Sequence, residues 1–397
     1  MSTGGLSKAR LGRLHDVMAG YVERGEVPGV ITLVERHGEA HVDVLGSAAF
    51  GGPALSRDSL FRISSMTKPI AAAAAMALVE QCRLRLGEPL DELLPEMASR
   101  RVLARIDGPL DETVPAERAI TLRDLLTFRM GFGQLYLPEE PPIVRAANEA
   151  GIGMGPPRPS EMPEPDEWMR RLGSLPLMCP PGGRWLYNTG SDVLGVLLAR
   201  VGGSLEEVLR ETVLDPLGMD DTRFTGDAGR LVTAYGGDLT VYDPPDGEWS
   251  RPPSFPSAAA GLVSTVDDLL RFGRMMLHFG RCGSGRVLAR PTVEAMVTDQ
   301  LTPGDKAVSG FYPGYFDTRG WGFGLSMTTA RRHRVGARPL RLGRRARHVV
   351  VLRSEGGPGR DPADAEGRVP AVQQPVPGLL DLGVPVNRGL ARPPRRG

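Results

Sequence analysis

The sequence predicts an α/β (α+β) fold in which helices flank an antiparallel β-sheet. Apolar residues recur with a helical period over residues 6–24. Residues 29–36 and 41–45 are typical of two strands, and His37-Gly38 between them forms a turn signal. A long apolar segment at residues 70–79 then indicates a buried helix. Helix, hairpin and helix in this order are the start of an antiparallel sheet covered by helices.

The remaining chain carries further helix and strand signals. Thr121 and Thr265 are each placed to cap a helix. Residues 138–165 are rich in Pro, Gly and Glu, which favours a long loop with one helical turn at 146–150. We expect helices at 166–172, 189–198, 204–214 and 266–276 and strands at 257–264 and 321–327.

The start of the apolar helix holds a candidate reactive pair. Ser65 and Lys68 are three residues apart, nearly one helical turn, so their side chains are neighbours. A hydroxyl is a poor nucleophile until a nearby base takes its proton. The N-terminus of a helix also favours an oxyanion. Ser65 is therefore a candidate nucleophile that becomes acylated, and Lys68 is its candidate base.

A structural alternative exists for this pair. Serine often caps a helix, and a lysine three residues later is often solvated. However, the chain contains only three lysines among its 48 basic residues. The apolar helix that follows Lys68 also predicts that this lysine is buried. Both observations favour the reactive interpretation.

The composition limits the class of protein. With 397 residues, 41% hydrophobic and 24% charged, the chain is typical of a globular protein with two structural units. We expect no secretory signal, and the longest apolar run is about half of what spans a bilayer, so no membrane partner is expected. The cysteines are far apart, which favours reduced thiols and a cytoplasmic location: Cys82, Cys179 and Cys282. No metal-binding or nucleotide-binding motif is present, so no cofactor is expected.

A second candidate site residue follows a Pro/Gly turn. Residues 180–183 lead into Trp185 and Tyr187, and an apolar helix comes next. Tyr187 is either a core residue with a hydrogen-bonded hydroxyl or, as a tyrosinate beside a lysine ammonium, a general base. The residues alone leave both alternatives open.

Together these segments resemble the class C β-lactamase-like serine hydrolases, which include esterases and D-alanyl-D-alanine carboxypeptidase-type proteins. The resemblance covers about residues 6–330 and depends on an ordered set of segments: 61–68, 120–127, 181–194, 215–222, 261–270 and 321–325. It implies a β-lactamase/transpeptidase-like fold. Residues 1–80 and 256–330 would form a discontinuous sheet domain, with residues 81–255 as an inserted, mainly helical lobe.

The resemblance also implies roles for individual residues. Ser65 would be the nucleophile, Lys68 the amine that activates it, and Tyr187 the base and proton shuttle of a Tyr-x-Asn box. Here the box reads Tyr187-Asn188-Thr189, with threonine where the family often has asparagine. Asn188 and Thr189 are the candidate substrate-binding residues. This departure favours an esterase that acts on a small ester or amide. The alternatives are a β-lactamase, a D-Ala-D-Ala carboxypeptidase or a non-catalytic binding protein of the same fold.

Residues 331–397 differ from the rest of the chain. They contain 15 basic and 5 acidic residues and no Phe, Tyr or Trp, whereas residues 1–330 contain 33 basic and 42 acidic residues. The Lys/His/Trp-x-Gly box of the family should lie here, and it is missing from these residues. A disordered tail or a nucleic-acid-binding extension would be basic. Without aromatic residues or a helical period, no nucleic-acid partner is expected, and the tail is predicted to be disordered.

A change of reading frame explains this tail better. Codons for residues 337–351, read one base later, allow PGRYGWDGGLGTSWY, which contains a Trp-x-Gly box. Later residues allow SDPKEDLVGILLTQ and FLDFWTSAYRSIED, with a stop codon allowed at residues 390–391. We therefore hypothesise a frame change near residues 328–336. The chain as written is then expected to be inactive or poorly folded, with a sheet edge left unpaired.

Overall fold

The computed structural model describes residues 5–134, 140–153, 155–329 and 348–353. Its helices are α1 (Lys8–Glu23), α2 (Thr67–Glu80), α3 (Leu122–Leu126), α4 (Pro142–Glu149), α5 (Pro165–Ser174), α6 (Thr189–Gly202), α7 (Leu205–Leu209), α8 (Asp215–Leu217), α9 (Val266–Leu277), α10 (Arg290–Met296) and α11 (Pro303–Ala307). The longer strands are β1 (Gly29–Arg36), β2 (Glu39–Gly46) and β13 (His348–Arg353). The short strands are β3 (Phe61–Arg62), β4 (Arg101–Leu103), β5 (Thr113–Pro115), β6 (Ala234–Tyr235), β7 (Val241–Asp243), β8 (Val263–Ser264), β9 (Arg281–Cys282), β10 (Gly285–Arg286), β11 (Arg319–Trp321) and β12 (Ser326–Thr328).

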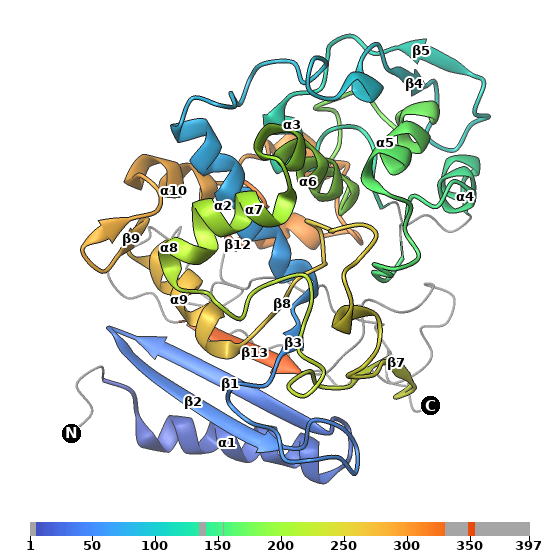
Figure 1. Cartoon of the computed structure of the whole chain (residues 1–397). Helices are drawn as coiled ribbons and strands as arrows, with labels where there is room; N and C mark the ends of the chain where they lie inside the picture. Colours follow the sequence, from blue (N-terminus) through green and yellow to red (C-terminus); the bar gives the residue numbers. More distant parts are fainter. Residues whose placement is uncertain (1–4, 135–139, 154, 330–347, 354–397) are drawn as a thin grey trace, which may run out of the picture.

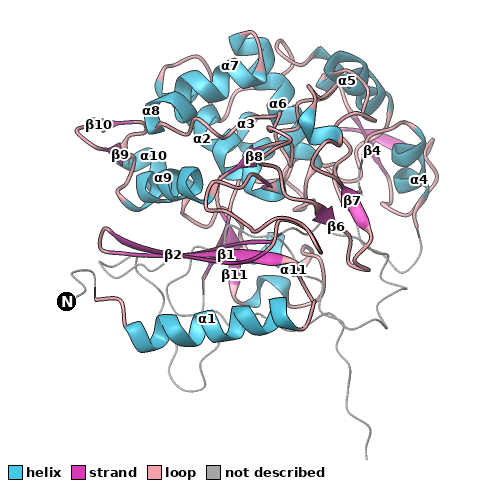
Figure 2. Cartoon of the chain, turned by 60° about the horizontal axis from the view of Figure 1, so that its bottom comes forward, coloured by secondary structure: helices cyan, strands magenta, loops and turns pink. Residues whose placement is uncertain are grey.

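An antiparallel sheet of order β13-β1-β2 forms the base of the molecule (Figure 1). In β1, Leu33 lies opposite Val42 of β2 and Val350 of β13. Helix α1 lies along one face of this sheet, and α9 lies on the opposite side (Figure 2). The predicted α+β class is therefore confirmed, and both strands of the expected hairpin form. Strand β1 is buried along seven of its eight residues because layers cover both of its faces.

Helix α2 runs through the centre of the helical layer. Twelve of its fourteen residues are buried, including the whole run of alanines at residues 71–75. A helix that is apolar all round must be enclosed by other elements. Alanine side chains also allow neighbouring backbones to approach closely. The helix that follows Ser65 is therefore held from every side.

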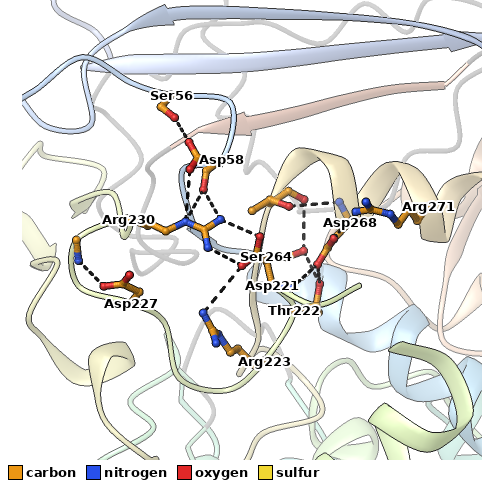
Figure 3. Close-up of polar contacts among 12 residues, drawn as sticks. Ser56, Asp58, Asp221, Thr222, Arg223, Asp227, Arg230, Ser264, Asp268 and Arg271 are labelled. Carbon is orange, nitrogen blue, oxygen red and sulfur yellow. Dashed lines mark hydrogen bonds and ion pairs between the residues drawn. The ribbon is translucent and has the colours of Figure 1, made fainter. Parts of the chain in front are cut away.

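A polar network fixes the strands that lead to Ser65 (Figure 3). Strand β3 comes directly before the Ser65 turn and pairs with β8. Below β8, the Thr222 hydroxyl donates to Asp268 of α9 over 2.9 Å and bonds Ser264 of β8 over 2.7 Å. Arg230 donates to the Asp221 carboxylate over 2.6 and 2.8 Å. The loop after α8 is thus hydrogen-bonded to both β8 and α9, which stabilises the strand pair that leads to the Ser65 turn.

Four elements differ from the sequence-based expectation. The expected strand at 257–264 is wrong over most of its length, because residues 258–260 form a turn and only Val263–Ser264 form β8. The predicted single strand at 321–327 is wrong, because the chain turns at Gly324 and forms the hairpin of β11 and β12. The expected single turn at 146–150 is the end of the longer helix α4. The expected helix at 204–214 changes at Leu209 from α7 to a π-helical segment, Arg210–Leu214.

The basic tail contributes one described element. Residues 348–353 form β13 and pair with β1. The expectation that a sheet edge stays unpaired is therefore wrong for β1. The prediction of a disordered tail is wrong for these six residues. The rest of the tail, 331–347 and 354–397, lies outside the described residues. The division into a discontinuous sheet domain and an inserted lobe stays a prediction.

Gly324 is expected to be essential for stability. Its φ is +74°, and a Cβ there would lie 2.4 Å from the Cβ of Ala72 in α2. Gly324→Ala is expected to lower the free energy of unfolding by about 2–5 kcal/mol, from the left-handed backbone and the steric overlap together. Urea denaturation measures this change. Gly273→Ala in α9 is the matched control, because a Cβ there meets nothing within 4 Å. It is expected to gain about 0.5–1 kcal/mol, and equal effects at the two sites would contradict the prediction.

Candidate active site

The structure places Ser65 and Lys68 side by side. Ser65 lies in a 3₁₀ turn, Ser64–Met66, directly before α2. Ser64 has a φ of +46°, an uncommon conformation for a residue with a side chain. The Lys68 Nζ lies 3.1 Å from the Ser65 Oγ. Ser65 is half-buried, whereas Lys68 is 2% exposed. The solvated-lysine alternative is therefore wrong for this chain.

Lys68 is surrounded by groups that accept its protons. Its Nζ donates to the Ala259 carbonyl over 2.7 Å and to the Asn188 Oδ1 over 2.8 Å. The same Nζ lies 4.5 Å from the centroid of the Tyr187 ring. Burial lowers the pKa of the Lys68 amine to about 7, and the nearby Asp192 charge opposes that shift. At neutral pH a substantial fraction of this amine is therefore free to accept a proton.

Tyr187 packs in an aromatic cluster. Its ring lies 5.4 Å from Phe128, 5.1 Å from Phe311 and 5.9 Å from Trp321, measured between centroids. The side chain is 4% exposed. Its backbone carbonyl accepts from the Gln134 amide over 2.8 Å, which fixes the loop on which it lies. The ring is thus held next to Lys68. Tyr187 is therefore a buried core residue and, at the same time, a neighbour of the reactive pair.

The two residues that follow Tyr187, Asn188 and Thr189, lie in different surroundings. Asn188 adopts a φ of +80°, which turns its side chain to the Lys68 amine and to the cavity. This strained backbone brings the amide to Lys68 although it stands one position earlier than in the family pattern. Thr189 is the first residue of α6, is buried, and does not line the cavity.

Sequence reasoning missed a second layer of residues behind Lys68. Asp192 is buried in the first turn of α6. Its Oδ1 accepts from the Ser257 hydroxyl over 2.6 Å and from the Ala259 amide over 3.3 Å. The available signal was a carboxylate in an otherwise apolar helix five residues after Tyr187. The turn at 257–260 gave no such signal, because the group that it presents to Lys68 is the backbone carbonyl of Ala259.

A cavity of about 240 Å³ opens beside these residues. Its walls come from the Ser65 turn, the start of α6, and residues 257–260. The segment between α4 and α5 also lines the cavity, through Pro156, Pro157 and Met162. Ser65, Tyr187 and Asn188 all face this space. The arrangement offers the Ser65 hydroxyl and the Tyr187 ring to a small molecule, and the buried Lys68 amine lies 3.1 Å from that hydroxyl.

The position expected for the third box lies outside the described residues. Among residues 5–134, 140–153, 155–329 and 348–353, no group of three or more His, Cys, Asp or Glu side chains could hold a metal ion. Within the same ranges, no helix is long and apolar enough to cross a membrane.

The fold and the Ser-x-x-Lys turn beside a buried tyrosine define a β-lactamase/transpeptidase-type α+β protein. The sequence model of the Beta-lactamase family matches residues 14–352. The chain belongs to this family, among its class C β-lactamase-like serine hydrolases.

The chain is similar to several known proteins. Protein Rv1367c of Mycobacterium tuberculosis is 39% identical over 319 residues, 77% of this chain and 76% of that protein. Esterase EstB of Burkholderia gladioli is 30% identical over 339 residues, 79% of this chain and 78% of that protein. Among solved structures, EstCE1, a hydrolase with promiscuous acyltransferase activity, gives a TM-score of 0.66 at 23% identity and covers 87% of this chain and 93% of its own. The similarity to EstCE1 shows the fold, and the relatives support a hydrolase-type enzyme.

Proposed function

We propose that this chain is built as a serine esterase that acts through an acyl-enzyme on a small ester or amide. The observation that carries the proposal is the 3.1 Å contact between the Ser65 hydroxyl and the buried Lys68 amine. A neutral amine at this distance accepts the serine proton as Oγ attacks the carbonyl carbon. The Oγ–C bond forms and the bond to the leaving group breaks. Tyr187 relays the proton to the departing oxygen or nitrogen. Water then attacks the acyl carbon, the Oγ–C bond breaks, the acid leaves and the Ser65 Oγ regains a proton.

The cavity supports a small acyl group. Its volume of about 240 Å³ lies below the roughly 300–1,000 Å³ typical of sites for drug-sized ligands. The displaced box, in which Asn188 binds Lys68, supports an esterase over a β-lactamase. The name of EstB supports the same choice. The description of EstCE1 favours a second candidate, in which an alcohol replaces water as acyl acceptor.

The missing third box supports a further part of the proposal, that the chain as written turns over slowly or not at all. The family's box contributes a backbone donor to the oxyanion, and loss of one such donor costs about a hundred- to a thousandfold in rate. Covalent labelling of Ser65 is a single event, so it remains measurable when turnover is slow.

Labelling with a fluorophosphonate tests the proposal. We expect one adduct per chain, mapped by peptide mass spectrometry to Ser65. We also expect p-nitrophenyl acetate to protect Ser65 from the fluorophosphonate faster than nitrocefin or a D-Ala-D-Ala peptide does. Faster protection by nitrocefin would favour a β-lactamase. An ester product formed from added alcohol would favour acyl transfer. A folded chain that stays unlabelled would leave only the non-catalytic binding protein.

A further inference from the structure

Lys68 lies in a buried pair with Asp192, a residue that the proposed chemistry does not use directly. Both side chains are at most 3% exposed. Burial raises the pKa of the Asp192 carboxyl, and the Ser257 hydroxyl, the Lys68 charge and the Ala259 amide oppose that shift. Its place in the first turn of α6 favours the carboxylate, since the positive end of the helix dipole lies there. No hydrogen bond joins Asp192 to Lys68 directly in the described part of the chain.

The two side chains are connected through one turn of backbone. Asp192 accepts from the Ser257 hydroxyl and the Ala259 amide. The Ser257 oxygen in turn accepts from the Ala259 and Ala260 amides over 3.2 and 3.1 Å. The carbonyl of that same Ala259 accepts from the Lys68 Nζ. A shift of the Asp192 side chain would therefore move the oxygen that holds the amine.

We propose that Asp192 is a positioning residue for Lys68: it fixes the turn at 257–260, whose Ala259 carbonyl holds the amine, and it places a negative charge near that amine. The inference deepens the proposed function and depends on it for the role of Lys68. The groups that face the amine are Ser65 from the turn before α2, Tyr187 and Asn188 from the loop before α6, and Asp192 from α6 itself. Asp192 is the carboxylate among them.

The charge and the position have separable consequences. A buried amine without a nearby carboxylate becomes a weaker base, because burial disfavours its protonated form. Asp192 keeps the amine basic enough to take the serine proton. Misplacement of the Ala259 carbonyl would instead slow acylation without changing the basicity of the amine.

The lysine content of the chain makes the charge measurable. Lys8, Lys68 and Lys306 are the lysines of the sequence, so Lys8→Arg and Lys306→Arg variants assign the signals of ¹³C,¹⁵N-lysine in an NMR titration. We expect the Lys68 signal to titrate near pH 7 in the unchanged chain. In Asp192→Asn, the midpoint is expected to fall by about one to three pH units. Fluorophosphonate labelling at pH 9 is expected to slow by about tenfold or more.

Two further variants complete the test. Ser257→Ala keeps the charge but removes a bond to the turn, so labelling should slow while the midpoint stays within about half a unit. Glu35→Gln removes another buried carboxylate, which lies in β1 and is bonded to Arg274 of α9, and should leave both the Lys68 midpoint and the labelling rate unchanged.

The outcomes distinguish this inference from the proposed function. An Asp192→Asn midpoint equal to that of the unchanged chain, with unchanged labelling, overturns the inference. The inference is also overturned if Glu35→Gln shifts the Lys68 midpoint as much as Asp192→Asn does. If Asp192→Asn does not fold, Ser257→Ala decides, and a labelling rate equal to that of the unchanged chain counts against the inference. If Ser65 is never labelled but the midpoint shifts, the positioning inference stands and the proposed function fails.

Discussion

Replacement of Lys68 by methionine is expected to slow acylation of Ser65 by about 10²–10⁴-fold, the usual contribution of a general base. Methionine keeps much of the length of the side chain and needs no hydrogen bond, so it fits the buried space. It leaves the Ser65 hydroxyl without the amine at 3.1 Å. Ser65→Ala gives the background rate of labelling, because it removes the attacking oxygen. The rate of fluorophosphonate labelling, followed by intact mass, reports the effect.

The chain contains a matched control for this lysine. Lys306 is paired with Asp299 and partly exposed, and Lys306→Met removes the same charge away from the Ser65 turn. Its labelling rate is expected to match that of the unchanged chain. Melting curves show whether either variant fails to fold. If Lys68→Met is labelled as fast as Lys306→Met, the amine is not the base for Ser65.

Restoring the alternative reading frame is expected to raise hydrolysis of p-nitrophenyl acetate by about a hundred- to a thousandfold. The reason is the Trp-x-Gly box encoded one base later at residues 342–344, which in the family supplies an oxyanion donor. The comparison uses two full-length chains that share residues up to the frame change. Steady-state kinetics of both chains measure the ratio.

Two controls accompany that comparison. Ser65→Ala in the restored chain should remove the gained activity, which ties the gain to the same nucleophile. The coding DNA gives an independent check: its codons at Leu342-Gly343 must read TGG one base later. A different codon choice there, or a burst of Ser65-dependent hydrolysis at full rate from the chain as written, would falsify the frame hypothesis.

The sequence predicted the elements whose signals are local. The caps show this best: Thr121 accepts from the Asp124 amide and Thr265 from the Asp268 amide, as their positions before apolar runs indicated. The hairpin at Gly324 was missed because the alternation of aromatic and small residues fits one strand equally well. Only the packing of that glycine against α2 requires the turn.

The candidate site was predictable where it depends on spacing. Ser65 and Lys68 are neighbours through helical geometry, so the sequence carries their contact. The approach of Asn188 to Lys68 depends on a φ of +80°. The identity of a residue does not determine its φ, so the sequence did not predict this approach. The Asp192 network depends on tertiary contacts between α6 and the turn at 257–260, and these are absent from any local pattern.

The short hairpin of β11 and β12 touches both halves of the candidate site. In its turn, Gly324 packs against Ala72, one turn beyond Lys68 on α2. At the end of β11, three residues earlier, the Trp321 ring lies against Tyr187 and Phe128. The hairpin therefore acts as a spacer between the nucleophile helix and the tyrosine loop. A change in the size of residue 321 would alter the gap between serine and tyrosine without touching either residue, which offers a way to tune which acyl groups the site accepts.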